Sequence, residues 1–191
     1  MKWFYRCLCL SLLLTSALAY AGNSEQALVN RLKQGDAVLM VRHALAPGTG
    51  DPDNFTLGQC ETQRNLNDTG RQQARAMGDW LRGHGIEHSL VYSSQWCRCL
   101  ETAQLMQMGE VHELPALNSF YEMPADREPN LSALRTLLSK PDLQSELIIL
   151  VTHQVTVSAH TGMFIDSGHG AVFIRGDTGS LDYLGELEFG Y

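Results

Sequence analysis

Two arginines and two histidines are the residues of this sequence best suited to carry chemistry. Arg42 and His43 directly follow the apolar run Val38–Val41. Arg98 and His153 stand later in the chain, each shortly after another apolar run. Arginine side chains bind phosphate oxygens through paired hydrogen bonds and stay charged at every working pH. A neutral histidine can act as a nucleophile. If they converge, these side chains would form a pocket for a phosphate dianion.

The apolar runs indicate how these side chains would be positioned. The run Val38–Val41 is too short for an amphipathic helix, and the turn residues around it favour a strand buried on both faces. In an open α/β sheet, ligands bind at the carboxyl ends of the central strands. Taken alone, Arg42 and His43 at such an end fit either an ordinary ion pair or a binding site. Three strand ends that deliver an arginine or a histidine to one edge favour the binding site.

Strands and helices are expected to alternate along the chain. Further strands are expected over Ser89–Tyr92, Glu146–Val151, Ala171–Ile174 and Leu181–Phe189. Helices are expected over Ser24–Gln34, from an Asn67 cap to Gly83, from a Ser93-Ser94 cap to Met108, from an Asn130 cap over Leu131–Leu138, and over Val155–Thr161. Residues 45–64 are expected to form a long loop, and residues 110–129 are expected to be irregular. The alternation predicts a three-layer α/β/α sandwich with a mostly parallel central sheet.

The N-terminus has the pattern of a bacterial signal peptide. Two basic residues precede an apolar run from Cys7 to Ala19, and small residues before Ala21 offer a cleavage site. We therefore expect residues 1–21 to be removed and residues 22–191 to form a single domain in the periplasm or outside the cell. An uncleaved anchor is the alternative. The apolar run is short for a membrane span, so no stable membrane insertion is expected after cleavage.

Charge restricts the class of partner. Residues 22–191 contain 12 basic and 21 acidic residues, a net charge of −9. So acidic a chain is a poor candidate for binding nucleic acid or an anionic membrane surface. Binding of a phosphorylated substrate would need a local positive field made by a few arginines.

Three cysteines follow the predicted signal peptide. In an oxidising compartment, Cys60 is expected to form a disulfide with either Cys97 or Cys99, which lie too close in sequence to bridge each other on a helix. Three buried thiols are the alternative. No spacing of cysteines or histidines supports a zinc site, and neither a metal nor a cofactor is expected.

Four motifs resemble the histidine phosphatase superfamily, the phosphoglycerate mutase-like branch 1. They are Val41-Arg42-His43-Ala44, Leu66-Asn67-x-x-Gly70-x-x-Gln73-Ala74, Ser93-Ser94-x-x-x-Arg98-x-x-x-Thr102-Ala103 and Val151-Thr152-His153. Their order and spacing agree with the family over residues 37–162. The resemblance implies a phosphoglycerate mutase-like fold and a phosphoric monoester hydrolase that needs no metal.

The family's chemistry can be transferred to matching residues. It implies that His43 attacks phosphorus, while its other ring nitrogen is held by a backbone carbonyl. Arg42, Arg98 and His153 would hold the phosphoryl oxygens and balance their charge. Water would then hydrolyse the phosphohistidine.

This sequence also departs from the family pattern. Ala44 replaces the usual glycine, and the Thr-x-x-Asn that often comes next is missing. Thr49 or Asn54 would take the place of these two residues only in part. The usual proton donor is missing too, because Ser119 and Gln154 stand where family members have an acid. We expect Glu122 to supply the proton, although an exposed loop carboxylate without a role is the alternative. Further acidic candidates are Asp51, Asp53, Asp126 and Glu128.

The resemblance also favours one disulfide. In the family, the residue directly after the second arginine is small and buried, and Cys99 holds that position here. This implies a bridge from Cys60 to Cys97, with Cys99 as a buried thiol.

Three functions are compatible with these features. The first is a periplasmic phosphomonoesterase that acts through phosphohistidine on a small phosphorylated substrate. The Ala46-Pro47-Gly48-Thr49-Gly50 loop and the expected export are similar to members that act on lipopolysaccharide core heptose phosphate, so an envelope phosphosugar is one such substrate. A phosphatase of phosphohistidine proteins is another possibility within the family. The alternatives are a mutase of the same family and a phospho-ligand binding protein with impaired catalysis.

Overall fold

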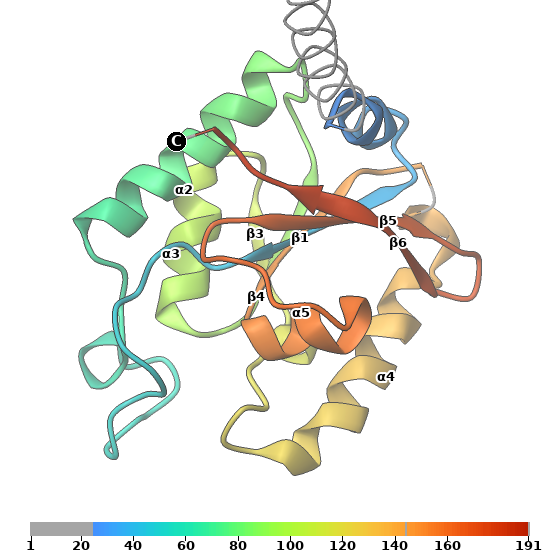
Figure 1. The fold of residues 1–191 in the computed structure, drawn as a ribbon. Helices are drawn as coiled ribbons and strands as arrows, with labels where there is room; N and C mark the ends of the chain where they lie inside the picture. Colours follow the sequence, from blue (N-terminus) through green and yellow to red (C-terminus); the bar gives the residue numbers. More distant parts are fainter. Residues whose placement is uncertain (1–24, 144, 191) are drawn as a thin grey trace, which may run out of the picture.

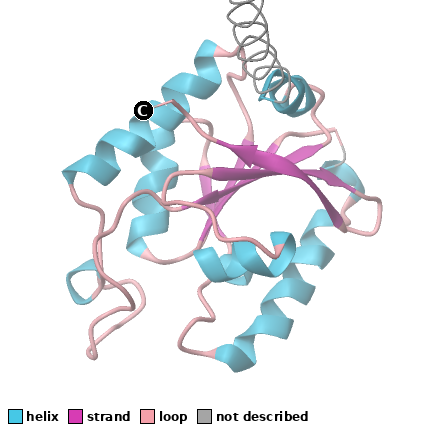
Figure 2. Cartoon of the chain, viewed as in Figure 1, coloured by secondary structure: helices cyan, strands magenta, loops and turns pink. Residues whose placement is uncertain are grey.

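A six-stranded sheet lies between two layers of helices in the computed structural model (Figures 1 and 2). The structure describes residues 25–143 and 145–190. The predicted signal peptide, residues 1–21, lies outside the described residues.

The sheet is mostly parallel, as predicted. Its strands are β1 (Ala37–Arg42), β2 (Leu90–Ser93), β3 (Val111–Glu113), β4 (Ile148–Thr152), β5 (Gly170–Arg175) and β6 (Leu181–Leu187). Their order is β3-β2-β4-β1-β5-β6. The first four run parallel to one another, whereas β5 pairs antiparallel with both β1 and β6.

Two groups of helices cover the two faces of the sheet. Residues 25–32 are helical, and the later helices are α2 (Asp68–Gly83), α3 (Cys97–Met106), α4 (Arg127–Leu138) and α5 (Gln154–Thr161). One core cluster joins Leu39 and Val41 of β1 to α2 and α3, and the other joins Val38 and Met40 to α4 and α5. Because successive side chains of a strand point to opposite faces, β1 is buried on both sides. This confirms the predicted three-layer sandwich.

The close packing of α2 against α3 depends on a glycine. A Cβ atom placed on Gly78 would lie 1.9 Å from the carbonyl oxygen of Met106. Any larger residue at this position would force the two helices apart. Within the described ranges, no helix is long and apolar enough to cross a lipid bilayer.

Two predicted helix starts are wrong. Ser93 and Ser94 do not cap α3, which begins at Cys97 after an N-cap at Trp96, and it ends at Met106 because Gln107 is left-handed, with φ 54°. The hydroxyl of Ser94 instead makes hydrogen bonds with the side chains of Asn118 and His153.

The predicted cap at Asn130 is also wrong. Helix α4 begins at Arg127, so Pro129 lies in its first turn. Proline is tolerated there because the first N–H groups of a helix have no intrahelical partner. Asn130 donates a side-chain hydrogen bond to the carbonyl of Asn118 at 3.3 Å instead.

The segment predicted to be irregular contains a short strand. Val111–Glu113 form β3, which pairs with β2 at the edge of the sheet. Three-residue turns come next at η2 (Pro115–Leu117) and η3 (Pro124–Asp126), and others occur at η1 (Cys60–Thr62) and η4 (Pro141–Leu143). Three residues, of which only Val111 is partly buried, carry too little apolar alternation to be recognised as a strand from sequence.

Candidate active site

The carboxyl ends of three adjacent parallel strands form the base of the site. Strands β2, β4 and β1 lie side by side, and Arg42 pairs in register with Thr152. The backbone N–H of His43 donates to the carbonyl of Thr152 at 2.9 Å. His43 and His153 therefore leave the sheet at the same edge, with their ring centroids 5.5 Å apart.

His43 is held as a neutral ring with one defined tautomer. Its Nδ1–H donates to the carbonyl oxygen of Ala44 at 2.8 Å, which leaves the lone pair on Nε2. Nε2 makes no hydrogen bond with the described residues, and the ring lines the pocket. Burial and the positive charge of Arg98 lower the pKa of His43 from 6.5 to about 3. The ring is therefore an available nucleophile at neutral pH.

Side chains of α2 and α3 fix the backbone just after His43. The N–H of Ala44 donates to the hydroxyl of Thr102 at 3.1 Å, and that hydroxyl donates to the carbonyl of Arg98 at 2.7 Å. The N–H of Leu45 donates to Gln73 Oε1 at 2.9 Å. The spacing of the sequence motifs thus corresponds to a set of hydrogen bonds that orient one loop.

Gly70 makes this arrangement possible at the start of α2. A Cβ at this position would lie 2.1 Å from the carbonyl oxygen of Leu45. The predicted cap is confirmed, since Asn67 Oδ1 accepts from the Gly70 N–H at 2.8 Å. The helix therefore begins in direct contact with the loop that it holds.

Arg98 forms a buried ion pair with Asp51. The guanidinium donates from both terminal nitrogens to the two carboxylate oxygens, at 2.7 and 3.1 Å, and the two side chains are 4% and 8% exposed. Asp51 also accepts from the Trp96 indole at 3.0 Å and the Arg64 backbone N–H at 3.0 Å. Although burial opposes it, these hydrogen bonds, led by that from Arg98, lower the pKa of Asp51.

Asp51 is consequently ionised and fully engaged, which argues against it as a proton donor. It instead fixes the orientation of Arg98. The Nε of Arg98 is buried without a hydrogen-bond partner among the described residues, and an oxyanion in the pocket would satisfy such a donor.

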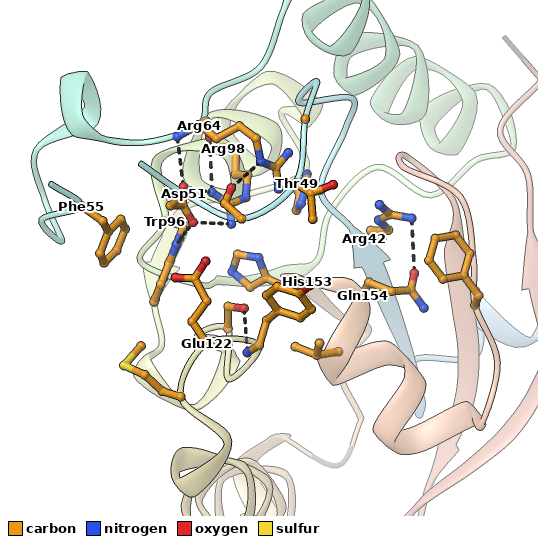
Figure 3. A pocket seen from close by; sticks show the side chains of 18 residues that line it. Arg42, Thr49, Asp51, Phe55, Arg64, Trp96, Arg98, Glu122, His153 and Gln154 are labelled. Carbon is orange, nitrogen blue, oxygen red and sulfur yellow. Dashed lines mark hydrogen bonds and ion pairs between the residues drawn. The ribbon is translucent and has the colours of Figure 1, made fainter. Parts of the chain in front are cut away.

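Two further arginines line the pocket. Arg42 donates to the carbonyl of Ile165 at 2.7 Å and, more weakly, to Gln154 Oε1 at 3.4 Å (Figure 3). Arg64 donates to the carbonyls of Gly50 and Ala46. Burial lowers the pKa of both guanidinium groups below the ordinary value. Arg64 was not expected from the sequence, because it matches no motif and its position depends on the path of the loop.

His153 is enclosed beside His43. Its Nε2 lies 2.8 Å from the hydroxyl of Ser94 and 3.5 Å from Cys99 Sγ, and the Trp96 ring packs against it edge-on. Burial and the charge of Arg98 lower the pKa of His153 well below its ordinary value. In the free protein this side chain can therefore offer a hydrogen bond to a ligand without adding a charge.

One cavity of about 310 Å³ brings most of the predicted site residues together. Its lining includes His43, Arg42, Arg98, His153 and Glu122. Thr49 and Asp51 also line it, whereas the other predicted candidates do not; these are Asn54, Asp53, Asp126 and Glu128.

Glu122 stands beside the loop that comes after His43. A Cβ on Gly50 would lie 2.9 Å from Glu122 Oε1, so this carboxylate approaches the loop backbone closely. Gly50 has φ +69°, a conformation that glycine adopts without strain. Glu122 is thus the carboxyl group of the pocket that is not tied to an arginine by a hydrogen bond or ion pair among the described residues.

The predicted disulfide is confirmed. Cys60 and Cys97 are bonded, and Cys99 is a buried free thiol. Burial raises the pKa of Cys99 to about 12, so it stays protonated. The bridge fastens the long loop to the first residue of α3, next to Arg98. No group of three or more His, Cys, Asp or Glu side chains in residues 25–143 and 145–190 is placed to hold a metal ion.

Comparisons with known proteins agree with this geometry. Residues 38–126 match the model of the histidine phosphatase superfamily (branch 1). A comparison with curated protein sequences gave no match.

Solved structures share the fold. A protein histidine phosphatase SixA complexed with tungstate is 18% identical over 80% of this chain and 97% of its own, with TM-score 0.55. A phosphoserine phosphatase from Entamoeba histolytica is 14% identical, over 80% and 96%, with TM-score 0.52. A mycobacterial glucosyl-3-phosphoglycerate phosphatase is 15% identical, over 78% and 95%, with TM-score 0.50. At these identities the likeness establishes the common fold.

Proposed function

We propose that this chain, which belongs to the histidine phosphatase superfamily (branch 1), hydrolyses phosphate monoesters through a phosphohistidine formed on His43. The observation that carries the proposal is the state of His43. Its ring is neutral, its tautomer is fixed by the Ala44 carbonyl, and Nε2 is open to a pocket lined by three arginines. A nucleophile next to fixed positive charge is what phosphoryl transfer requires.

In the first step, the lone pair of His43 Nε2 attacks phosphorus and the bond to the ester oxygen breaks. The phosphoryl oxygens would lie between Arg42, Arg98 and His153, whose N–H groups hold them in place. Arg64 adds a third positive charge to the pocket. In this proposal the arginines do the electrostatic work and the reaction uses no metal ion.

The leaving oxygen needs a proton, which we assign to the Glu122 carboxyl group. The resulting carboxylate then takes a proton from water as that water attacks the phosphohistidine, so the N–P bond breaks and phosphate leaves. Histidine and carboxyl group return to their starting states. Glu122 suits the role of proton donor because the other acidic candidate that lines the cavity, Asp51, forms an ion pair with Arg98.

We further propose that the protein works in the bacterial periplasm, after cleavage of residues 1–21, on an envelope phosphosugar. The Cys60–Cys97 bond supports an oxidising compartment. The cavity is large enough for a small phosphorylated molecule. Fractionation of the producing bacterium, with sequencing of the mature N-terminus, tests the location, and Gly22 is the expected first residue.

Purified wild-type protein and the variant His43→Ala test the reaction. Wild type should release phosphate from 4-nitrophenyl phosphate and should trap an acid-labile phosphoryl group. We expect His43→Ala to lower kcat at least about 1,000-fold and to trap none. Equal phosphate release by both proteins would contradict the mechanism. Tight phosphate binding without turnover by wild type would favour the alternative, a phospho-ligand binding protein.

Glu122→Gln tests the proton donor in the same assays. An alkyl phosphate needs protonation of its leaving group, so its kcat should fall about 100-fold. The nitrophenolate ion leaves without a proton, so kcat for 4-nitrophenyl phosphate should change much less. Glu128→Gln is the matched control, because Glu128 is exposed and does not line the cavity. Equal losses on both esters would assign Glu122 another role.

A further inference from the structure

Exposed apolar side chains gather at the mouth of the cavity. The large hydrophobic side chains exposed in the described part of the chain are Leu57, Tyr121, Met123, Met163, Phe164 and Leu184. Three of them line the cavity, namely Tyr121, Met123 and Phe164, with 60%, 44% and 68% exposure. Exposed apolar groups collected around one opening indicate a binding surface rather than chance.

Phe164 links this surface to the phosphate site. The guanidinium carbon of Arg42 lies 4.9 Å from the centre of the Phe164 ring. Arg42 is itself held by the Ile165 carbonyl, directly after Phe164 in the chain, and by the Gln154 side chain. The Phe164 ring therefore lies within reach of the organic group of a phosphate ester bound to Arg42.

Aromatic side chains also form the opposite wall. Phe55 stacks on Trp96 with ring centroids 5.0 Å apart and planes inclined by 20°. Figure 3 shows Phe55 and Trp96 on one side of the pocket and Arg42 and Gln154 on the other. The Trp96 indole is fixed by its hydrogen bond to Asp51. The cavity therefore combines a cationic base with two apolar walls.

We propose that this mouth is a binding subsite for a ring in the organic group of the substrate, held by its apolar face against Phe164 and Tyr121. This inference rests on the proposed phosphatase function and narrows its substrate class to ring-bearing phosphate monoesters. The C–H face of a sugar ring and the face of an aryl ring offer the same chemistry to an aromatic side chain. A short acyclic alcohol phosphate could fill the cationic base but would leave the apolar walls in water.

Three primary alkyl esters test the subsite without changing the type of leaving group. They are glucose 6-phosphate with a sugar ring, benzyl phosphate with an aryl ring, and glycerol 1-phosphate without a ring. We expect kcat/KM for at least one ring ester to exceed that for glycerol 1-phosphate by about 10-fold. The order of the two ring esters then tells whether the ring is a sugar or an aryl group.

Phe164→Ala should lower the ratio of ring to acyclic kcat/KM by about 5-fold, mainly through KM, and Tyr121→Ala should lower it in the same direction. Leu184→Ala is the control, because Leu184 is also a large exposed apolar side chain but does not line the cavity. Its ratio should match that of wild type.

Two outcomes would overturn the subsite. One is equal kcat/KM for all three esters in wild type. The other is a loss in Phe164→Ala that is the same for every ester, since this would mean that Phe164 acts only through Arg42. Neither outcome would contradict the proposed phosphatase function. Absence of hydrolysis of these esters and of 4-nitrophenyl phosphate would instead contradict the proposed function itself.

Discussion

Asp51 is a carboxylate of the cavity whose hydrogen bonds hold other residues of the site in place. It accepts hydrogen bonds from Arg98, Trp96 and the Arg64 backbone, and so ties the long loop to α3. A guanidinium with two donors committed to a carboxylate presents its remaining N–H groups in a fixed direction. Asp51 is therefore a positioning residue for Arg98.

Asp51→Asn tests this role. Loss of the charge leaves Arg98 buried without its partner, which should lower the free energy of unfolding by about 3 kcal/mol. We expect kcat/KM for phosphate esters to fall about 10-fold, because the fork of Arg98 is no longer held. Asp53→Asn is the matched control on the same loop, since Asp53 is exposed and does not line the cavity.

Urea denaturation and phosphate inhibition measure the two effects. A tighter inhibition by inorganic phosphate in Asp51→Asn would contradict the positioning role. It would mean that the Asp51 carboxylate competes with substrate for Arg98.

At the level of elements, the candidate site has strand ends at its base and loops at its walls. Strands β1 and β4 deliver Arg42, His43 and His153 to one edge. The loop over residues 45–64 and the segment after η2 then close over them. Loops carry many of the functional residues, whereas the sheet supplies a rigid base.

The Cys60–Cys97 bond is the covalent clamp of the long loop. It spans 37 residues, and a chain-entropy argument gives it about 4 kcal/mol of stabilisation. The double variant Cys60→Ser/Cys97→Ser should therefore unfold at a Tm lower by about 10 °C. We also expect a higher KM, because the loop that carries Asp51 is less firmly held.

Cys99→Ser serves as a comparison for the disulfide variant, since it removes a thiol that is not in the bridge. Calorimetry and steady-state kinetics check both effects. An unchanged Tm in the double variant would show that the loop is held by its noncovalent contacts alone.

At the scale of the whole molecule, a positively charged site lies in a chain whose net charge is negative. The net charge is −7 for the full sequence, yet three arginines line a single cavity. Their field, added to burial, keeps His43 and His153 neutral. Burial together with the charge of Arg135 lowers the pKa of His160 as well, although this residue does not line the cavity.

These buried histidines predict a loss of stability in acid. In the unfolded chain a histidine binds a proton below about pH 6.5, whereas folded His43 does so only near pH 3. Between these values the unfolded state binds more protons, so the free energy of unfolding falls as the pH is lowered. Each such histidine contributes up to about 1.4 kcal/mol per pH unit.

Urea denaturation at pH 7, 6 and 5 measures this slope. His43→Gln removes one of the groups and should flatten it, whereas substitution of the exposed His88 should not. A stability that does not change between pH 6.5 and pH 4.5 would contradict the prediction.

The sequence by itself determined five of the six strands, the order of the helices and the residues at the strand ends. Apolar runs mark buried strands, and the residues just after a run are carried to a predictable edge, so Arg42, His43 and His153 could be placed together. Arg98 could be placed near them, since it follows another apolar run, and the family resemblance added the choice of Cys97 over Cys99 as the partner of Cys60. These features depend on short-range spacing, which a single sequence retains.

Only the tertiary structure decided the rest of the pocket. Asp51 lies 47 residues from Arg98 in the chain, and nothing in its local sequence distinguishes it from Asp53. Arg64 and Phe164 line the cavity because of the course of the irregular segments that carry them. The course of such a segment is fixed by many long-range contacts. For the same reason, Ser94 was expected to cap a helix but contacts His153. The residues that a loop side chain contacts are set by tertiary packing, and the local periodicity of the sequence does not predict that packing.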